Sequence, residues 1–370
     1  MSVYDELGVQ VFINARAPYT RLGGAIMLQE VVEAMVEASR YSVSIEELQT
    51  QVGSTIAERT RNQAAYVSCG AASGVILAVA ACIAGRDPDL ADRLPRTEGL
   101  RNEVVMPECD RGTECDVAIR AAGGRIVPVG DQDRTEASQV AAAISERTAA
   151  VLTVLSSSSA KPEVGDLIQT AHAAGVPILI DAADSLPPRE NLWKWTHASG
   201  ADAIIFSGGK GLGGPQGTGL VLGSRSVIEG CRFHGSPNHR IGRGMKVGKE
   251  ELVGIYTAVK MLMNSTDEAD LRLAESKAMN LLDLLHDVDG LKCSLVNPNT
   301  VLLQFSEESV GLTYRECWDW FMSNEPAVMM LNWANTPGGL CMRTKLLSPE
   351  QVVVVADQIK RFFRLHVTRA

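Results

Sequence analysis

The sequence predicts an α/β protein with a mostly parallel central sheet, helices on both faces of that sheet, and a smaller α/β domain towards the C-terminus. Three observations carry this prediction. From about residue 64 to residue 223, short β-rich runs alternate with amphipathic stretches that are typical of helices. The β-rich runs are apolar throughout, as expected for strands covered on both sides. The chain has 370 residues, 45% of them hydrophobic, which allows a large core and excludes disordered and fibrous proteins.

The expected elements follow in order along the chain. Two helices are expected first, at residues 28–39 and 45–61. Seven strands follow, at residues 65–68, 103–106, 125–129, 150–155, 176–180, 203–206 and 219–222, with helices between them at 71–84, 136–146 and 164–174. Helical patterns then cover 245–264 and 268–288, and the last part mixes a strand at 300–305 with helices at 314–323 and 349–363. We therefore expect an N-terminal arm with helices (1–62), a large domain (63–245), and a connecting helix with a small C-terminal α/β domain (246–370).

Composition and charge narrow the class of function. The 35 basic and 44 acidic residues give a net charge of −9, which disfavours broad electrostatic binding to nucleic acid or to an anionic membrane. The sequence shows no run of about 18 apolar residues and no signal-peptide pattern, so we expect no membrane segment. The eight cysteines form no CxxC pair and the histidines show no metal spacing. We therefore expect a cytoplasmic protein with reduced thiols and no metal site.

A glycine-rich segment, SGGKGLGGPQG at residues 207–217, follows the strand at 203–206. Its single lysine, Lys210, stands at the carboxyl end of a strand, which is where ligands bind in parallel sheets. Lysine forms Schiff bases, and low local polarity would depress its pKa. The alternative is a surface turn with an exposed lysine. A nucleotide-binding fingerprint fits less well, because the glycines lead into a strand and match neither GxGxxG nor GxxxxGK[ST].

An acidic residue, Asp181, ends the apolar run at 176–180. A carboxylate there is costly unless it has a cationic or hydrogen-bonding partner. In enzymes that use pyridoxal phosphate (PLP), that partner is the protonated pyridine nitrogen of the cofactor. The alternative is an aspartate that caps the next helix. Because Asp181 and Lys210 end neighbouring strands, the pair indicates a cofactor held between those strands.

The first strand of this region ends in a small-residue segment, SCGAASG, that opens a helix. Free N–H groups and the helix dipole favour anions at such a position. We expect Gly70, Ala71 and Ala72 to cradle a phosphate, helped by the hydroxyl of Ser207 or Ser73. An ordinary strand-to-helix turn is the alternative. Together the segments occur in the order phosphate loop, acid, lysine.

These segments, with motifs over nearly the whole chain, resemble fold-type-I PLP enzymes, and specifically the group related to L-seryl-tRNA(Sec) selenium transferase. That group includes the D-glucosaminate-6-phosphate ammonia-lyases. The motifs are LG and IN within 7–14, YTRLGG at 19–24, GSTIAE at 53–58, IDAA and LPP within 180–188, NLW at 191–193, FSGGK and GPQ within 206–216, and IGR and MKVGKEE within 241–251. The resemblance implies the fold-type-I transferase architecture. It makes Lys210 the lysine that binds PLP covalently and Asp181 the partner of the ring nitrogen, with the loop Gly70–Ala72 and Ser207 at the phosphate.

The sequence also offers candidates for residues that bind the substrate. By resemblance the N-terminal segment closes over the active site, which makes Thr20 and Arg21 candidates. Arg243 and Lys246 stand in a basic, glycine-containing loop that suits a carboxylate or phosphate, with a solvated charge cluster as the alternative. Arg343 stands in the C-terminal domain, where many fold-type-I enzymes place the arginine that binds the α-carboxylate.

The sequence also departs from the group's pattern. Residues 16–18 read Arg-Ala-Pro where the group has small-Gly-Thr. The residue that stacks on the cofactor ring is expected near 108–111, where no aromatic side chain or histidine stands, and Cys109 or Arg111 is the available substitute. Asp184 replaces a small or neutral residue and is expected to cap the next helix.

The resemblance implies a PLP-dependent lyase that takes a small amino acid, with a β-hydroxyl or of sugar origin, removes its α-proton, eliminates the β-substituent and releases ammonia. A racemase or epimerase and an aminotransferase are the alternatives, since they share the first proton transfer. A selenium transferase acting on charged tRNA is disfavoured by the net charge. We expect a small-molecule amino-acid substrate, no nucleic acid, no membrane, and at least a homodimer, since fold-type-I sites usually draw on two subunits.

Overall fold

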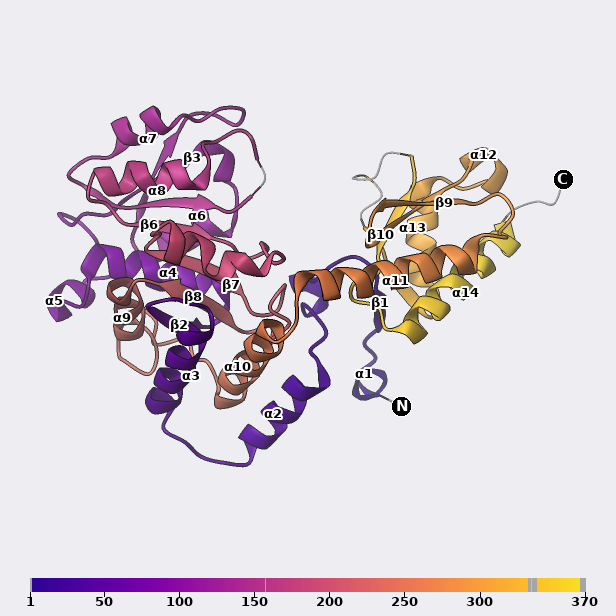
Figure 1. Ribbon diagram of the computed structural model, residues 1–370, viewed down its shortest axis with the longest axis horizontal. Coiled ribbons are helices and arrows are strands. Elements are labelled where there is room, and N and C mark those ends of the chain that lie inside the picture. Colours follow the sequence, from indigo (N-terminus) through magenta and orange to yellow (C-terminus); the bar gives the residue numbers. More distant parts are fainter. Residues whose placement is uncertain (1, 157, 332–333, 335–337, 367–370) are drawn as a thin grey trace. The chain divides into compact units, whose positions relative to one another are not determined.

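The computed structural model describes residues 2–156, 158–331, 334 and 338–366, and the chain forms two compact units (Figure 1). One unit is Met27–Asn264. The other joins Met1–Ile26 to Ser265–Ala370. None of the helices in the described part of the chain combines the length and the apolar character that a membrane span needs.

The larger unit is built on a seven-stranded sheet. Its strands are β2 (Ala64–Ser68), β3 (Glu103–Pro107), β4 (Arg125–Val129), β5 (Thr148–Val154), β6 (Ile178–Asp181), β7 (Ala203–Ser207) and β8 (Gly219–Gly223). Their order across the sheet is β2-β8-β7-β6-β5-β3-β4. Strand β8 is antiparallel to both of its neighbours, β2 and β7. The other neighbouring pairs, β7–β6, β6–β5, β5–β3 and β3–β4, are parallel. The predicted mostly parallel sheet is therefore confirmed.

Helices cover both faces of this sheet, as predicted. One face carries α4 (Gly70–Ala84), α6 (Glu114–Ala121) and α9 (Arg225–His234), and the other carries α3 (Ile45–Arg59), α7 (Ala137–Ala143), α8 (Val164–Ala173) and α10 (Lys249–Met263). Successive strand residues point to opposite faces: Ile178 and Ile180 pack with the second group of helices, and Leu179 packs with the first. All three side chains are fully buried. Each such side chain stabilises the fold by roughly 1.5–3 kcal/mol, which explains why the predicted strands are apolar throughout.

The smaller unit has its own strands, helices and core. Its elements are α1 (Val3–Glu6), β1 (Phe12–Asn14), η1 (Thr20–Leu22), α11 (Asp267–Leu285), β9 (Lys292–Asn297), β10 (Thr300–Gln304), α12 (Glu307–Val310), α13 (Tyr314–Ser323), β11 (Ala327–Met329), β12 (Leu340–Arg343) and α14 (Pro349–His366). Strands β12, β10 and β9 form an antiparallel sheet, and β1 pairs in parallel with β11. An aromatic cluster that includes Phe321, Phe362 and Phe363 fills the core.

The division into units differs from the expected boundaries after residues 62 and 245. Residues 27–62 belong to the larger unit because α2 (Gln29–Ser39) and α3 pack against α10. The first residues join the C-terminal part because β1 pairs with β11. Helix α10 begins at Lys249 rather than near 245, since Gly248 donates its N–H to Glu251 Oε2 at 2.8 Å and starts the helix there. The remaining short elements are α5 (Pro88–Ala91), η2 (Glu108–Asp110), η3 (Arg189–Leu192) and the π-helical turn η4 (Lys194–Ala198).

Candidate active site

A cavity of about 690 Å³ lies at the carboxyl ends of the central strands, within the larger unit. Asp181 and Lys210 both line it. The strand register explains why the two meet there. Asp181 is the last residue of β6 and pairs with Ile205 on β7, and β7 then leads into the glycine-rich segment that carries Lys210. The sequence-based expectation that these two strand ends share one site therefore agrees with the structure.

The carboxylate of Asp181 has hydrogen bonds but no cation close to it. Its Oδ1 accepts the N–H of Ala183 at 2.8 Å, and its Oδ2 accepts the thiol of Cys115 at 2.9 Å. No lysine, arginine or histidine of the described part of the chain lies within ion-pair distance. Burial raises the pKa of Asp181, while the two hydrogen bonds and the more distant charge of Lys210 act in the opposite direction. A group that brings a positive charge to this carboxylate would remove the cost of burying it.

The amine of Lys210 is available for chemistry. Its side chain is half-buried, lines the cavity, and makes no hydrogen bond or ion pair with any residue that the structure describes. The loop around it is tight because its glycines leave no room for a side chain. A Cβ at Gly209 would lie 2.6 Å from the Cα of Gln216, and a Cβ at Gly211 would lie 2.6 Å from the carbonyl oxygen of Leu186. Tight packing of the loop backbone thus fixes the position of the Lys210 Cα.

The expected phosphate loop stands at the same edge of the sheet. Helix α4 begins at Gly70, whose φ of 80° suits glycine, and Cys69 provides no side-chain cap for the first N–H groups. The register Ser68–Gly219–Ser207 brings this helix start next to the end of β7. Gly70, Ala71, Ala72 and Ser207 are not among the described residues that line the cavity itself. Their backbone N–H groups and the Ser207 hydroxyl remain the candidates for the phosphate, and this role stays a prediction.

The substrate-side candidates fall into two groups. Thr20 and Arg21 in η1 and the exposed Arg343 at the end of β12 belong to the smaller unit, so their part in the site stays a prediction. Arg243 and Lys246 belong to the larger unit, in the loop between α9 and α10. Their side chains are exposed and are not among the described residues that line the cavity. Their role also stays a prediction.

The segment that follows β3 differs from the sequence-based expectation. Cys109 and Arg111, the expected substitutes for a stacking residue, are not among the described lining residues, and Arg111 instead pairs with Asp116 at 2.9 Å. Thr113 and Glu114, at the start of α6, line the cavity instead, and the next residue is the Cys115 that contacts Asp181. A turn, η2, separates the strand end from these residues, and the stacking role of Cys109 or Arg111 stays a prediction.

Two further features of the cavity wall were missed or misjudged. Asp184 caps no helix; it lines the cavity and, like Glu114, makes no hydrogen bond or ion pair with a described residue. Behind the wall, Lys161 and Asp110 form an ion pair of 2.5 Å with side chains only 2% and 3% exposed. Ser156 also lines the cavity, and Ser157 lies outside the described residues.

The residues present suit a PLP molecule on three independent grounds. The half-buried carboxylate of Asp181 has no cation within ion-pair distance among the described residues, and the protonated ring nitrogen would supply one. An unpartnered lysine amine shares its cavity. An uncapped helix start with a glycine at its first position offers N–H donors for a phosphate. A doubly wound sheet with this constellation at its carboxyl edge defines the class of fold-type-I PLP-dependent enzymes.

Comparison with known proteins gives the family. A family model described as L-seryl-tRNA selenium transferase matches residues 114–282. A 5'-C-glycyluridine monooxygenase-decarboxylase from Streptomyces sp is 32% identical in an alignment, gaps included, of length 377 that covers 98% of this chain and 92% of the relative. A D-glucosaminate-6-phosphate ammonia lyase from Salmonella typhimurium is 34% identical over 265 residues, 70% of this chain and 69% of the relative. An L-seryl-tRNA(Sec) selenium transferase from Rhizobium meliloti is 28% identical, with 66% of this chain and 53% of the relative covered.

Solved structures agree. A D-glucosaminate-6-phosphate ammonia-lyase matches with a TM-score of 0.89 and 25% identity over 99% of both chains. The serine palmitoyltransferase of Sphingomonas wittichii, at 12% identity and a TM-score of 0.56 over 96% of this chain and 88% of that one, shares the fold. The chain belongs to the PLP-dependent group related to L-seryl-tRNA(Sec) selenium transferase, as its motifs predicted. It is an enzyme with a fold-type-I architecture, and its cofactor is PLP.

Proposed function

We propose that this enzyme is a lyase that releases ammonia from a small, sugar-derived amino acid carrying a β-hydroxyl group. The observation that carries the proposal is the shared cavity of Lys210 and Asp181, in which the amine lacks a protein partner and the carboxylate lacks a cation. The name of the ammonia lyase, 34% identical to this chain, supports the reaction and the substrate class.

The residues take distinct roles in the proposal. Asp181 would hold the ring nitrogen of PLP, the N–H groups of Gly70–Ala72 and the hydroxyl of Ser207 would hold its phosphate, and Lys210 would bind its aldehyde group. When bound, PLP supplies a ring that withdraws electrons from the bonds at the substrate α-carbon. The freed Nζ of Lys210 takes the α-proton. Loss of the β-hydroxyl as water, followed by addition of water and loss of ammonia, converts a 2-amino-3-hydroxy acid into a 2-oxo acid.

The cavity wall supports a substrate rich in hydroxyl groups. Glu114 and Asp184 are acceptors without a described protein partner, and substrate hydroxyls are donors that would pair with them. Thr113 and Ser156 add hydroxyls to the same wall. Cations for a substrate carboxylate or phosphate would come from Arg21, Arg243, Lys246 or Arg343, and Thr20 would add a hydroxyl. We propose that the N-terminal arm covers the site and that the cytoplasmic enzyme works as a homodimer or higher homo-oligomer.

The test is a product assay on the PLP-loaded enzyme with a panel of sugar-derived and short β-hydroxy amino acids. We expect equal amounts of ammonia and 2-oxo acid from at least one sugar-derived member, and none from Lys210→Ala. Replacing Asp184 with Asn is expected to raise KM several-fold with little change in kcat, because the side chain binds the substrate remote from the reacting atoms. Deuterium at the α-carbon of recovered substrate in heavy water, without 2-oxo acid, would reject elimination in favour of a racemase or epimerase. An amino acid formed from an added 2-oxo acid would indicate an aminotransferase.

A second candidate is an oxidative decarboxylation, which the name of the 5'-C-glycyluridine relative favours because that match covers 98% of this chain. The two reactions differ in what they consume. Elimination proceeds without oxygen and keeps the substrate carboxylate, whereas a monooxygenase-decarboxylase consumes O₂ and releases CO₂. Oxygen-electrode traces and CO₂ release with a glycyl-nucleoside substrate distinguish them. A selenium transferase would instead require a salt-dependent complex with tRNA.

A further inference from the structure

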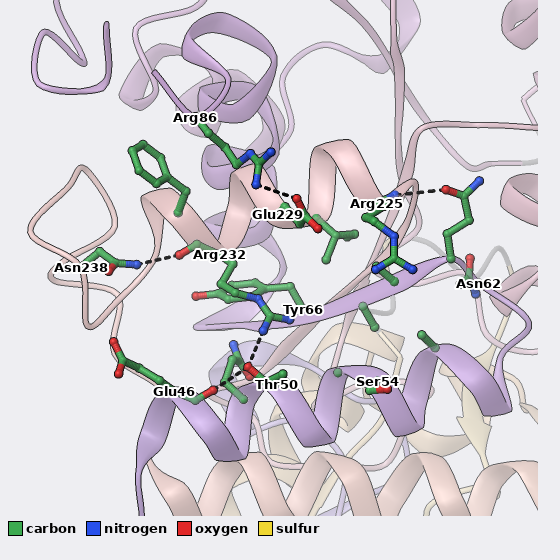
Figure 2. Close-up of a pocket in the computed structure, with 18 of the residues that line it drawn as sticks. Glu46, Thr50, Ser54, Asn62, Tyr66, Arg86, Arg225, Glu229, Arg232 and Asn238 are labelled. Carbon is green, nitrogen blue, oxygen red and sulfur yellow. Dashed lines mark hydrogen bonds and ion pairs between the residues drawn. The ribbon is translucent and has the colours of Figure 1, made fainter. Parts of the chain in front are cut away.

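A second cavity, of about 780 Å³, lies between α3, β2 and α9 in the larger unit (Figure 2). We call it the α3–α9 cavity. It belongs to the edge strand of the sheet, and its described lining shares no residue with that of the cavity at Lys210. Gly53 lets α3 lie close to β2 at this point, because a Cβ there would collide with the carbonyl oxygen of Ala65. No step of the proposed reaction uses this cavity.

Arg232 brings a positive charge to the cavity without a balancing carboxylate. Its side chain reaches from α9 towards α3, where one terminal nitrogen donates to the hydroxyl of Thr50 (Figure 2). Its Nε is buried and has no acceptor, and no carboxylate of the described residues lies within 4.0 Å of the guanidinium. By contrast, Arg86 at the rim pairs with Glu229 at 2.7 Å. A guanidinium held in this way is a ready donor for an anion.

Gln49 provides a hydrogen-bond acceptor at the floor of the α3–α9 cavity. Its Nε2 donates to the carbonyl of Val67 at 2.6 Å, which fixes the orientation of the amide. Its Oε1 therefore points elsewhere, accepts no hydrogen bond in the described structure, and belongs to a side chain that is only 6% exposed. A buried amide oxygen without a donor is costly. Tyr66 lines the floor beside it, and burial raises its pKa to about 12, so it stays a neutral phenol.

The charges around the mouth are mixed. Arg225 makes no side-chain hydrogen bond or ion pair with a described residue, and the exposed Glu46 and Glu58 also line the cavity. A phosphate dianion would meet both glutamates. A ligand with one carboxylate and one adjacent donor would satisfy Arg232 and Gln49 together and would bring at most one negative charge to the two glutamates.

We infer that the α3–α9 cavity binds a small carboxylic acid that carries a hydroxyl or ammonium group next to its carboxylate. Arg232 binds the carboxylate, and Gln49 Oε1 accepts the hydrogen bond of the neighbouring donor. An acidic segment of a second copy of this chain also offers carboxylates, but the side chains of Asp and Glu carry no hydroxyl or ammonium group next to them. The enclosed floor, with one donor and one acceptor unsatisfied, favours the free metabolite.

Isothermal titration of the PLP-loaded enzyme with L-lactate and with acetate tests the inference. Lactate has no amine and does not react at the cofactor, and acetate lacks the neighbouring hydroxyl. We expect lactate to bind at least tenfold more tightly than acetate. Arg232→Met is expected to weaken lactate binding at least tenfold, whereas Arg40→Met, which removes an exposed charge outside the cavity, leaves it unchanged. Gln49→Met is expected to abolish the preference for lactate over acetate.

Three outcomes would overturn the inference. One is the absence of saturable binding of either acid to the wild-type enzyme, and another is equal lactate affinity in Arg232→Met and wild type. The third is an Arg232→Met enzyme that dissociates in sedimentation runs without added acid, which would assign the acid to a second copy of the chain. An unchanged visible spectrum of bound PLP shows that Arg232→Met has folded. Arg232→Lys keeps the positive charge but loses the two parallel N–H donors of the guanidinium, so this variant is expected to bind lactate with intermediate affinity.

Discussion

Replacing Lys161 with Met removes one partner of the buried ion pair behind the active-site wall. The lysine ammonium lies 2.5 Å from Asp110 Oδ1 and donates to Thr153 Oγ1 at 3.1 Å. Asp110 also accepts the hydroxyl of Thr153 at 2.7 Å and the N–H of Val154 at 3.0 Å. Met matches the length of the lysine stem but leaves the carboxylate without a cation in a site where both side chains are almost fully buried.

Breaking such a pair from one side costs about 3–5 kcal/mol of unfolding free energy. For a unit of this size, 1 kcal/mol shifts the thermal midpoint by about 2–4 °C, so the expected loss is about 6–20 °C. The visible circular dichroism of bound PLP reports the unfolding of the larger unit alone, because the cofactor site lies within it. Thermal scans of the two enzymes in that signal give the shift directly.

Two matched variants control for charge and for volume. Arg134→Met breaks an exposed ion pair with Glu136, whose side chains are 78% and 50% exposed, and is expected to cost under about 1 kcal/mol. The double variant Lys161→Met with Asp110→Leu removes both charges and should recover most of the lost stability. A Lys161→Met midpoint close to that of Arg134→Met, or a double variant no more stable than the single one, would refute this reasoning.

Three further predictions concern the cofactor site. Gly219→Ala should weaken PLP binding at least tenfold in a fluorescence titration, since its Cβ would collide with the backbone of Gly70, whereas Gly165→Ala has open space and should leave binding unchanged. Burial raises the pKa of Asp181, so in the cofactor-free protein its charge lowers stability above the ordinary carboxyl range and not below it. Asp181→Asn should therefore gain more unfolding free energy at about pH 7 than at about pH 4 in urea titrations, and an equal gain at both would contradict this. Burial and the neighbouring Asp181 raise the pKa of Cys115, so mass spectrometry should find this thiol unmodified by iodoacetamide until the protein unfolds.

Much of the fold could be predicted because buried parallel strands leave a local signal. Each of the seven runs in the larger unit is mostly apolar, and each corresponds to an observed strand. The order of the strands and the reversed direction of β8 carry no such signal, since both depend on pairings between distant segments. The division into two units differs from the expected domain boundaries for the same reason: the contact between β1 and β11 joins segments far apart in the chain.

The site shows the same contrast. Asp181 and Lys210 could be predicted because each stands at or just after the end of an apolar strand. A charged group at that position is costly unless it has a partner or a function. Thr113 and Glu114 could not, because a turn separates them from the strand and their residue types match no motif. Lys161 resembles an ordinary loop lysine until its partner is known, and that partner, Asp110, comes from another strand end.

The parallel pairing of β1 with β11 has a consequence for synthesis of the chain. Phe12–Asn14 leaves the ribosome well before its partner, Ala327–Met329, because the whole of the larger unit lies between them in the sequence. The larger unit is therefore complete in the nascent chain first and can fold ahead of this pairing. Strand β1 thus stays without its hydrogen-bonding neighbour during that time, and its exposed edge must be kept from pairing with other strands.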